Sequence, residues 1–516
     1  MLEKIGDLLS NEGYIQELEV KAFPIKTGKH VVILHEIDAK ELGVMTGDRL
    51  ELINKKANKK CVAVADITQY SIKKYQIGLF QEVLDELKAK NGSIVTTTAT
   101  EPLASVENIK RKMRNEKLNY EEIREIVKDI SEERLSEIEA TAFVSAVFMR
   151  GLDLDETISM AKALIADGNR LDFGKGIIVD KHSVGGVNGR ATMIIVPIIA
   201  SSGLLMPKTS SRSITSAAGT ADSMEVLADV SLPMEKIKTI TEKVGGVIAW
   251  GGAVDLAPAD DKIIKIEHPL SLDPEGQVIA SVLAKKASVG SKYVVIDLPV
   301  GKYVKIKDKT VALRMAKKFV QVGKEVGMHV EAVITNGEGP CGLAFGSALE
   351  AKYALEILEE KRFDNLAQKS CELAGALFEM VGKAKPTHGY EMALEILQSG
   401  QALKKFKEII KAQGGKIDSS EMVPMAPYKK EFKAGTDGIV EEVNTKLLTK
   451  IARLAGAPIN KTAGLVIHKL AGDKIQNGEV LITIYAENKE KLDNAEKFAM
   501  KNIPFTFKRI ILKTIK

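Results

Sequence analysis

The sequence predicts a multidomain α/β and α+β protein. The expected parts are a small N-terminal β-barrel-like domain, a helical domain with a largely parallel α/β domain and a cleft, and a C-terminal α+β domain. Three observations predict this class. The 516 residues exceed what one core organises. Short alternating apolar segments fill the first hundred residues. Strand and helix patterns then alternate from about residue 176 onward.

Residues 1–98 are predicted to form the β-rich domain. Alternating segments at 30–34 and 49–53 are broken by Gly43 and by the turn at 46–48, and 38–44 reads as a short helical turn. No catalytic constellation is visible there, so assembly is the expected role, with a second binding site as the alternative. Residues 99–106 form the expected linker.

Residues 104–175, with part of the following region, are predicted to form the helical domain. Apolar residues recur at helical spacing and predict one buried face made of Leu135, Ile138, Ala142, Ala146 and Met149. Residues 176–415 are predicted to form the α/β domain. Its expected strands are 177–179, 246–249, 293–296 and 329–334, with ligand-binding loops at the strand ends.

The region 420–516 is predicted to be an α+β domain with Gly-rich turns. The turn at 472–479 resembles one found in lipoyl-like barrels. The Met-Lys-Met attachment site of biotin domains is absent, so this turn is interpreted as structural.

Composition excludes several classes of protein. The net charge is +5, from 74 basic and 69 acidic residues, and this near balance is not typical of a nucleic-acid-binding protein. The three cysteines (Cys61, Cys341 and Cys371) are far apart and predict neither a disulfide scaffold nor a zinc motif. No secretory signal is visible, and the apolar run at 193–200 is far shorter than the ~20 residues of a membrane span. A cytoplasmic enzyme with no membrane or nucleic-acid partner is expected.

Two loop segments carry the strongest functional signal. Residues 180–190 and 210–222 are rich in small residues, hydroxyls and cations, and each follows an extended segment and precedes a helical pattern. Glycines permit close approach, amides and hydroxyls donate hydrogen bonds, and a helix N-terminus adds partial positive charge. Two such loops predict binding of more than one phosphate group.

These loops resemble the signature of thymidine and pyrimidine-nucleoside phosphorylases. The shared motifs are Lys-His-Ser-x-Gly-Gly, Ser-x-Arg and Gly-Thr-x-Asp-x-x-Glu, the last ending here at Glu225. The resemblance runs from about residue 104 to the C-terminus. The extra N-terminal segment and several substitutions are most similar to the archaeal AMP phosphorylases of that superfamily. The resemblance implies a cleft between the helical and α/β domains that closes on the substrates, and a homodimer or larger homo-oligomer.

The resemblance also implies a phosphate site. Lys181 would be the phosphate cation, and the positions where the family places phosphate-holding hydroxyls are Ser183, Thr192, Ser210 and Thr220. Taken singly, each of these hydroxyls would be interpreted as a helix cap or a packing group, and it is the ordered set that indicates phosphate binding. Gly185 and Gly186 would let backbone amides approach the ligand. His182 would contact sugar or phosphate, or serve a structural role.

Base recognition implies a departure from the pyrimidine enzymes. Ser281 and Lys285 match the family, but the arginine position falls on or beside Ile266-Glu267. The donor fork suited to a pyrimidine carbonyl is therefore missing, and adenine is expected. Asp273 is the predicted proton donor to the departing base, with a helix N-cap as the alternative role, and Asp255 is the reserve candidate.

A second phosphate is expected at the sugar side. Lys302 and Lys305 stand where the nucleoside enzymes have small neutral residues. The family's Arg-Gly-x-Gly-His is replaced by a segment that gains hydroxyls. The residues predicted to bind the nucleotide are therefore Gly185, Ser211, Arg212, Ser213, Ile214, Thr215, Ser216, Thr220 and Lys305.

The predicted reaction is phosphorolysis of AMP to adenine and ribose 1,5-bisphosphate, with CMP and UMP as further candidates. Inorganic phosphate is the co-substrate, and no metal or other cofactor is expected. Three alternatives remain: a pyrimidine-nucleoside phosphorylase, a phosphoribosyltransferase of similar fold that needs magnesium, and a non-catalytic binding protein.

Overall fold

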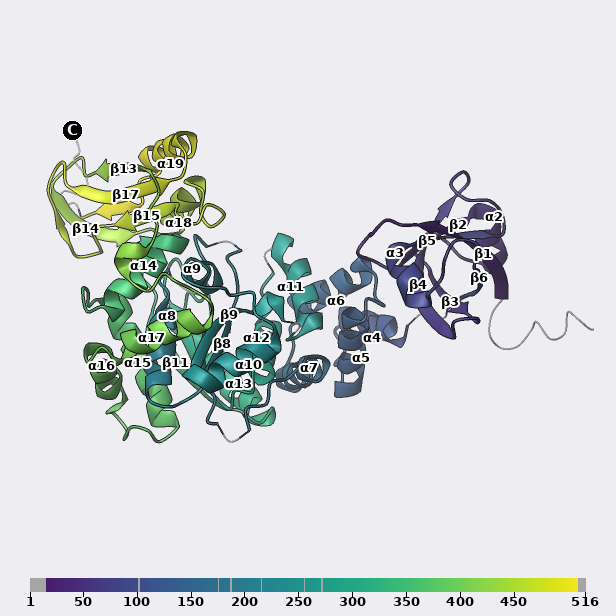
Figure 1. Ribbon diagram of the computed structural model, residues 1–516, viewed down its shortest axis with the longest axis horizontal. Coiled ribbons are helices and arrows are strands. Elements are labelled where there is room, and N and C mark those ends of the chain that lie inside the picture. Colours follow the sequence, from purple (N-terminus) through teal and green to yellow (C-terminus); the bar gives the residue numbers. More distant parts are fainter. Residues whose placement is uncertain are drawn as a thin grey trace, which may run out of the picture. The chain divides into compact units, whose positions relative to one another are not determined.

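The computed structural model describes residues 15–100, 103–174, 176–185, 188–214, 216–254, 256–270 and 272–508 (Figure 1). These residues form two compact units. The first contains the chain up to Asp167 together with Pro258–Gln277, and the second contains Gly168–Ala257 and the chain from Val278 onward.

Six strands of the first unit close into a barrel in the order β1-β5-β2-β4-β3-β6. They are β1 (Ile15–Phe23), β2 (Val31–His35), β3 (Arg49–Asn54), β4 (Lys59–Thr68), β5 (Gln76–Phe80) and β6 (Ile94–Ala99), and two short helices, α2 (Glu36–Leu42) and α3 (Gln81–Leu87), accompany them. Period-two alternation directs one side of each strand inward, so that Leu50 and Leu52 are fully buried. The predicted barrel is confirmed.

Helices make up the rest of the first unit. They are α4 (Ala104–Met113), α5 (Tyr120–Ser131), α6 (Glu137–Arg150), α7 (Leu154–Asp167) and α11 (Pro258–Leu270). Asn119 and Ser136 are the N-caps of α5 and α6 and form capping boxes. In each, the N-cap side chain accepts a hydrogen bond from the N3 amide, and the N3 glutamate side chain accepts one from the N-cap amide. Arg49 of the barrel pairs with Glu139 of α6.

The predicted buried face around α6 was partly wrong. Leu135 and Ala146 are buried, but Ile138 is 83% exposed and Met149 is 66% exposed. The helix buries Ala140, Phe143, Val144, Ala146 and Val147 instead. Apolar residues surround this helix, so spacing alone allowed two faces, and packing selected the one that carries Phe143.

Parallel strands form the centre of the second unit. They are β7 (Val179–Ser183), β8 (Met206–Ser210), β9 (Gly246–Trp250), β10 (Tyr293–Val300) and β11 (His329–Asn336). The pairs β11-β10-β7 and β8-β9 are parallel, and a parallel bridge between Ile178 and Leu205 joins β7 to β8. The first predicted strand was placed too early, because β7 extends through Lys181, His182 and Ser183, which were expected in a loop.

Helices connect and flank these strands. They are α8 (Ala191–Ser201), α9 (Thr220–Met224), α10 (Met234–Val244), a 3-10 turn (Gly251–Ala253), α12 (Glu275–Ser288), α13 (Lys309–Glu325), α14 (Ser347–Leu358), α15 (Asn365–Met380), α16 (Gly389–Gln398) and α17 (Gln401–Ala412). Helix α8 is buried along its length from Ala191 to Ala200 and contacts α14, α15, α16 and α17. This largely apolar helix lies at the centre of the core of the unit.

The chain after residue 413 adds a smaller α+β part with its own apolar cluster. Its elements are a 3-10 turn (Ser420–Met422), β13 (Tyr428–Lys433), β14 (Gly438–Val443), α18 (Thr445–Leu454), β15 (Gly464–Ile467), β16 (Lys474–Ile475), β17 (Val480–Ala486), α19 (Lys489–Lys501) and β18 (Phe505–Phe507). Strand β12 (Ala344–Phe345) joins it by pairing with β15. In the described part of the chain, no helix is both long and apolar enough to cross a membrane.

Candidate active site

The carboxyl ends of β7 and β10 lie side by side where the chain order of the sheet reverses. From β7 the chain proceeds outward to β8 and β9, and then returns to β10 on the other side of β7. Such a switch point is the usual ligand site of an open parallel sheet. Lys181, His182 and Ser183 of the predicted site occupy this end of β7.

Asp297 of β10 organises the switch point. It is fully buried and accepts hydrogen bonds from Ser183 Oγ at 2.6 Å and Thr335 Oγ1 at 2.5 Å, and Lys369 Nζ lies 2.9 Å away. Burial alone would raise the pKa of Asp297, but the charges of Lys181 and Lys369 and the two hydroxyl bonds hold it below its ordinary value. Ser183 therefore donates its proton inward, and phosphate binding through this hydroxyl requires it to turn.

Lys181 fits the role of a phosphate cation. Its side chain is buried, and desolvation lowers its pKa to about 8, against the opposing attraction of Asp297. A desolvated ammonium group interacts strongly with an incoming anion because little water screens it.

A second buried carboxylate, Asp180, lies one residue earlier on β7. Lys286 Nζ of α12 is 2.8 Å from Asp180 Oδ2, and Lys208 Nζ of β8 is 3.5 Å from Asp180 Oδ1. All three side chains are buried. Burial and the neighbouring cations hold the pKa of Lys208 well below its ordinary value. Lys208 and Lys286 were missed in the sequence because neither lies in the motif loops.

His182 is half-buried beside these lysines. Desolvation and the charges of Lys286 and Lys208 lower its pKa well below the ordinary value, so the imidazole is neutral near pH 7. A neutral imidazole supplies a hydrogen bond but no charge. Lys285 also contributes to this lowering, which brings the predicted base-side lysine of α12 near the end of β7.

Four lysines thus accompany two carboxylates on the neighbouring strands β7 and β10. Lys181 and Lys369 surround Asp297, whereas Lys208 and Lys286 surround Asp180. Asp180 and Lys181 are consecutive on β7, so the two groups lie on opposite faces of the sheet. When all are ionised, each group has one more positive than negative charge, which favours binding of an anion such as phosphate.

The glycine loop after β7 is shaped for close approach. A Cβ atom on Gly185 would lie 2.3 Å from the Cβ of Lys305, and the φ of Gly185 is +73°. The structure therefore brings together two predicted binding residues that are 120 positions apart in the sequence. Farther along, Asn188 donates to the carbonyls of Gly342 and Ala344 at 2.9 and 3.0 Å.

The second loop, 211–219, is built around Asp222. Asp222 Oδ2 accepts from the amides of Ser213 and Gly219 at 2.7 and 2.9 Å. A Cβ on Gly219 would approach the carbonyl oxygen of Ser211 to 2.5 Å, so this position excludes a side chain. Ser213 and Ser216 close the loop, since Ser213 Oγ donates to the carbonyl of Ser216 at 2.5 Å.

Arg212 braces this loop. Its guanidinium group pairs with Glu225 at 2.6 Å, lies 3.4 Å from Asp222 and stacks 4.7 Å from the centroid of the Trp250 ring. Arg212 and Lys461 together lower the pKa of Glu225 to about 2. The expectation that Arg212 binds the nucleotide phosphate stays a prediction, and in the structure its charge is met by carboxylates.

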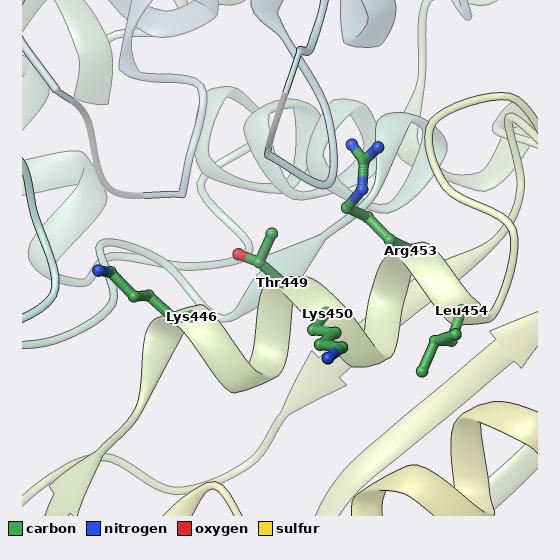
Figure 2. Close-up of a pocket in the computed structure, with 5 residues that line it drawn as sticks. All are labelled: Lys446, Thr449, Lys450, Arg453 and Leu454. Carbon is green, nitrogen blue, oxygen red and sulfur yellow. The ribbon is translucent and has the colours of Figure 1, made fainter. Parts of the chain in front are cut away.

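The C-terminal part supports the same loop. Lys461 Nζ lies 2.7 Å from Glu225, and Arg453 Nη1 donates to the carbonyls of Ile214 and Ser216 at 3.2 and 3.0 Å. Arg453 projects from α18, beside a surface pocket of about 420 Å³ that is lined by Lys446, Thr449, Lys450, Arg453 and Leu454 (Figure 2). Neither Lys461 nor Arg453 was predicted from the sequence, because both follow the motif region by more than 220 residues.

The other predicted residues are placed as follows. Thr192 is buried in α8, Ser210 ends β8, Ser211 is exposed and Thr220 begins α9. Ser281 and Lys285 lie four residues apart on one face of α12. Asp273 is exposed in the segment before α12 and belongs to the first unit. Gly186, Thr215 and Asp255 lie outside the described residues.

One expected phosphate ligand is engaged elsewhere. Lys302 Nζ lies 2.7 Å from Glu442 of β14, and Tyr303 donates its hydroxyl to the same carboxylate. Lys302 therefore joins β14 to the segment after β10, whereas Lys305 packs on Gly185.

The lowered pKa of Lys181 predicts a pH limit on phosphate binding. The ammonium form persists below about pH 8 and is lost as the pH rises through that value. Phosphate affinity, measured by isothermal titration calorimetry, should therefore fall above about pH 8. In Lys181→Arg the guanidinium group stays charged, so this alkaline loss should disappear. An affinity that is constant well above the pKa of Lys181 in the unmodified protein would contradict the assignment.

The charge excess predicts the effect of Lys286→Met. The variant leaves Asp180 with one cation, Lys208 at 3.5 Å. Breaking a buried pair such as that of Lys286 and Asp180 costs about 3–5 kcal/mol, so the melting temperature should fall. Phosphate affinity should fall more than about tenfold, because the combined excess of the two lysine–carboxylate groups drops from two positive charges to one.

The double variant Asp180→Asn/Lys286→Met restores the excess of two positive charges. It should recover most of the melting temperature and most of the phosphate affinity. Lys317→Met, at an exposed position of α13, is the control. Unchanged phosphate affinity in Lys286→Met would refute the role of the charge excess.

Comparisons with known proteins agree with this geometry. The chain matches the helical bundle domain of the glycosyl transferase family at residues 106–168, the a/b domain of that family at 175–403 and the pyrimidine nucleoside phosphorylase C-terminal domain at 439–506. Among solved structures, anthranilate phosphoribosyltransferase from Thermus thermophilus has the same fold over 60% of this chain and 99% of that chain, with a TM-score of 0.52 and 18% identity.

Full-length relatives are closer. AMP phosphorylase 1 of Archaeoglobus fulgidus is 48% identical over 493 residues, which cover 95% of this chain and 97% of that protein. AMP phosphorylase of Methanococcoides burtonii is 44% identical over 502 residues, which cover 97% and 99% of the two chains. The chain therefore belongs to the AMP phosphorylase family.

Proposed function

We propose that this protein catalyses phosphorolysis of AMP, giving adenine and ribose 1,5-bisphosphate. The observation that carries the proposal is similarity to AMP phosphorylases along nearly the whole chain. The lysines beside Asp180 and Asp297, the buried Lys181 among them, support phosphate as the co-substrate.

Different residues bind the two phosphate groups and protonate the departing base. Lys181 and the surrounding lysines hold inorganic phosphate, whose oxygen forms the new bond to C1′ as the bond from C1′ to N9 of adenine breaks. The electron pair of the broken bond departs with the base. Asp273 protonates N7, so adenine leaves as a neutral molecule. Lys305, beside Gly185, and the loop 211–216 hold the 5′-phosphate of the nucleotide.

The substrate assignment predicts which compounds release free base. AMP should release adenine only when inorganic phosphate is present, and the reaction should continue in EDTA. Adenosine should react at least about a hundredfold more slowly, because it lacks the 5′-phosphate and its charge-assisted hydrogen bonds. Chromatography of AMP, CMP, UMP, adenosine and uridine reactions measures this. Release from uridine alone would instead identify a nucleoside phosphorylase, and a magnesium requirement would favour a phosphoribosyltransferase.

If Asp273 is the proton donor, its substitution should lower activity without lowering stability. Asp273→Asn removes the proton but keeps a side chain that caps helices equally well. The rate constant kcat for AMP should fall about 10²–10⁴-fold, and the melting temperature should not change. Asp308→Asn, at the N-cap of α13, is the matched control and should leave kcat unchanged. A lowered melting temperature with unchanged kcat would assign Asp273 to capping alone.

A further inference from the structure

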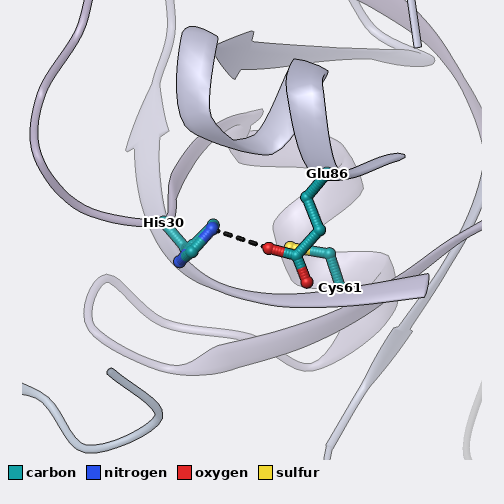
Figure 3. A group of neighbouring side chains, drawn as sticks. All are labelled: His30, Cys61 and Glu86. Atoms are coloured by element: carbon teal, nitrogen blue, oxygen red, sulfur yellow. Dashed lines mark ion pairs between the residues drawn. The ribbon is translucent and has the colours of Figure 1, made fainter. Parts of the chain in front are cut away.

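His30, Cys61 and Glu86 converge in the N-terminal barrel, and the proposed reaction uses none of the three. His30 directly precedes β2, Cys61 lies on β4, and Glu86 lies near the end of α3. One donor atom from each residue lies within 4.8 Å of the other two, and His30 Nε2 is 2.8 Å from Glu86 Oε2. Figure 3 shows the three side chains turned toward one another. Three separate elements thus supply an imidazole, a thiol and a carboxylate to one point.

We propose that these three residues form a binding site for a divalent transition metal, with Zn²⁺ as the best match. Nitrogen and sulfur donors together with one carboxylate are the ligands that zinc prefers, and the sulfur disfavours Mg²⁺ and Ca²⁺. Three protein ligands leave the fourth tetrahedral position for water. The donors of a tetrahedral zinc site lie about 3.5 Å apart, so the three side chains need shifts of about an ångström to close on the metal.

Charge balance supports this choice. Metal binding displaces the proton of Cys61, and the resulting thiolate and the Glu86 carboxylate together neutralise Zn²⁺ beside a neutral imidazole. Without the metal, the same geometry is an ion pair between His30 and Glu86 that covers a buried thiol. The side chain of Glu86 is about half exposed, so it can swing onto a metal without disturbing the core.

The grouping is specific to one cysteine. All three cysteines of the chain are buried free thiols. Within the described residues, only Cys61 belongs to a group of three side chains able to ligate a metal. Cys371 of α15 has a similar setting otherwise, since burial raises the pKa of both thiols to about 12. It is therefore the matched control for Cys61.

A metal at this position would tie the start of β2 to β4 and to α3. These elements belong to one closed barrel, whose apolar cluster is smaller than the two main clusters of the second unit. A bound ion that favours the folded state would stabilise the barrel by mass action. The proposed role is therefore structural, and phosphorolysis should not depend on it.

The test uses the full-length protein, freed of metal with a chelator and titrated with Co²⁺ and Zn²⁺. We expect one ion per chain by elemental analysis and a thiolate-to-cobalt charge-transfer band that zinc displaces. The band should vanish in Cys61→Ser and persist in Cys371→Ser. Glu86→Gln alters an exposed ligand without changing the core, and it should weaken zinc binding more than about tenfold. Zinc should raise the melting temperature of the unmodified protein but not that of Cys61→Ser.

Two results would overturn the proposal. One is the absence of stoichiometric cobalt binding in a folded, chelator-treated protein, which leaves only the ion pair of His30 and Glu86. The other is a charge-transfer band that survives in Cys61→Ser, which places the metal elsewhere. Release of adenine from AMP in EDTA is measured on the same preparation. The proposed reaction and the proposed metal site are therefore tested independently of each other.

Discussion

Two buried carboxylates, Asp180 and Asp297, are the constraint on which the centre of the second unit depends. They lie on the neighbouring parallel strands β7 and β10, and neither is stable there without cations. The lysines that satisfy them come from β7, β8, α12 and α15, which are elements far apart in the chain. The fold therefore gathers positive charge around β7 and β10 as a condition of its own stability.

The surplus of that charge connects stability to binding. Lys181 and Lys208 have lowered pKa values because burial and neighbouring cations disfavour their charged forms. A bound anion relieves this cost, so the free site is less stable than the occupied one. Burial and the neighbouring lysines also lower the pKa of His182, so its imidazole is neutral and acts as a hydrogen-bonding group.

The second loop, 211–219, is held by a different set of contacts. Its backbone is held by Asp222, its arginine by Glu225, and its carbonyls by Arg453 of the C-terminal part. The C-terminal part thus acts on the site through the backbone of the loop. Lys461 adds a second link, since it pairs with the carboxylates that hold Arg212.

Much of this could be predicted from the residues alone. Glycines and hydroxyls between strands and helices marked both loops, and period-two alternation marked the barrel. Lys208, Lys286 and Asp297 could not be found, because they resemble ordinary strand and helix residues until the sheet places them together. The prediction of the buried face of α6 failed for a related reason. When a helix has apolar residues on all sides, its sequence does not indicate which side is buried.

By itself, the sequence determined the multidomain α/β class and the resemblance to nucleotide phosphorylases, and it predicted two anion-binding loops. These depend on local properties, such as backbone freedom at glycine and the spacing of motifs. Only the tertiary structure decided which cations surround Lys181, that Arg212 is braced by carboxylates, and that His30, Cys61 and Glu86 converge. Those groupings join residues tens to hundreds of positions apart, and electrostatic contacts of that kind exist only after the chain has folded.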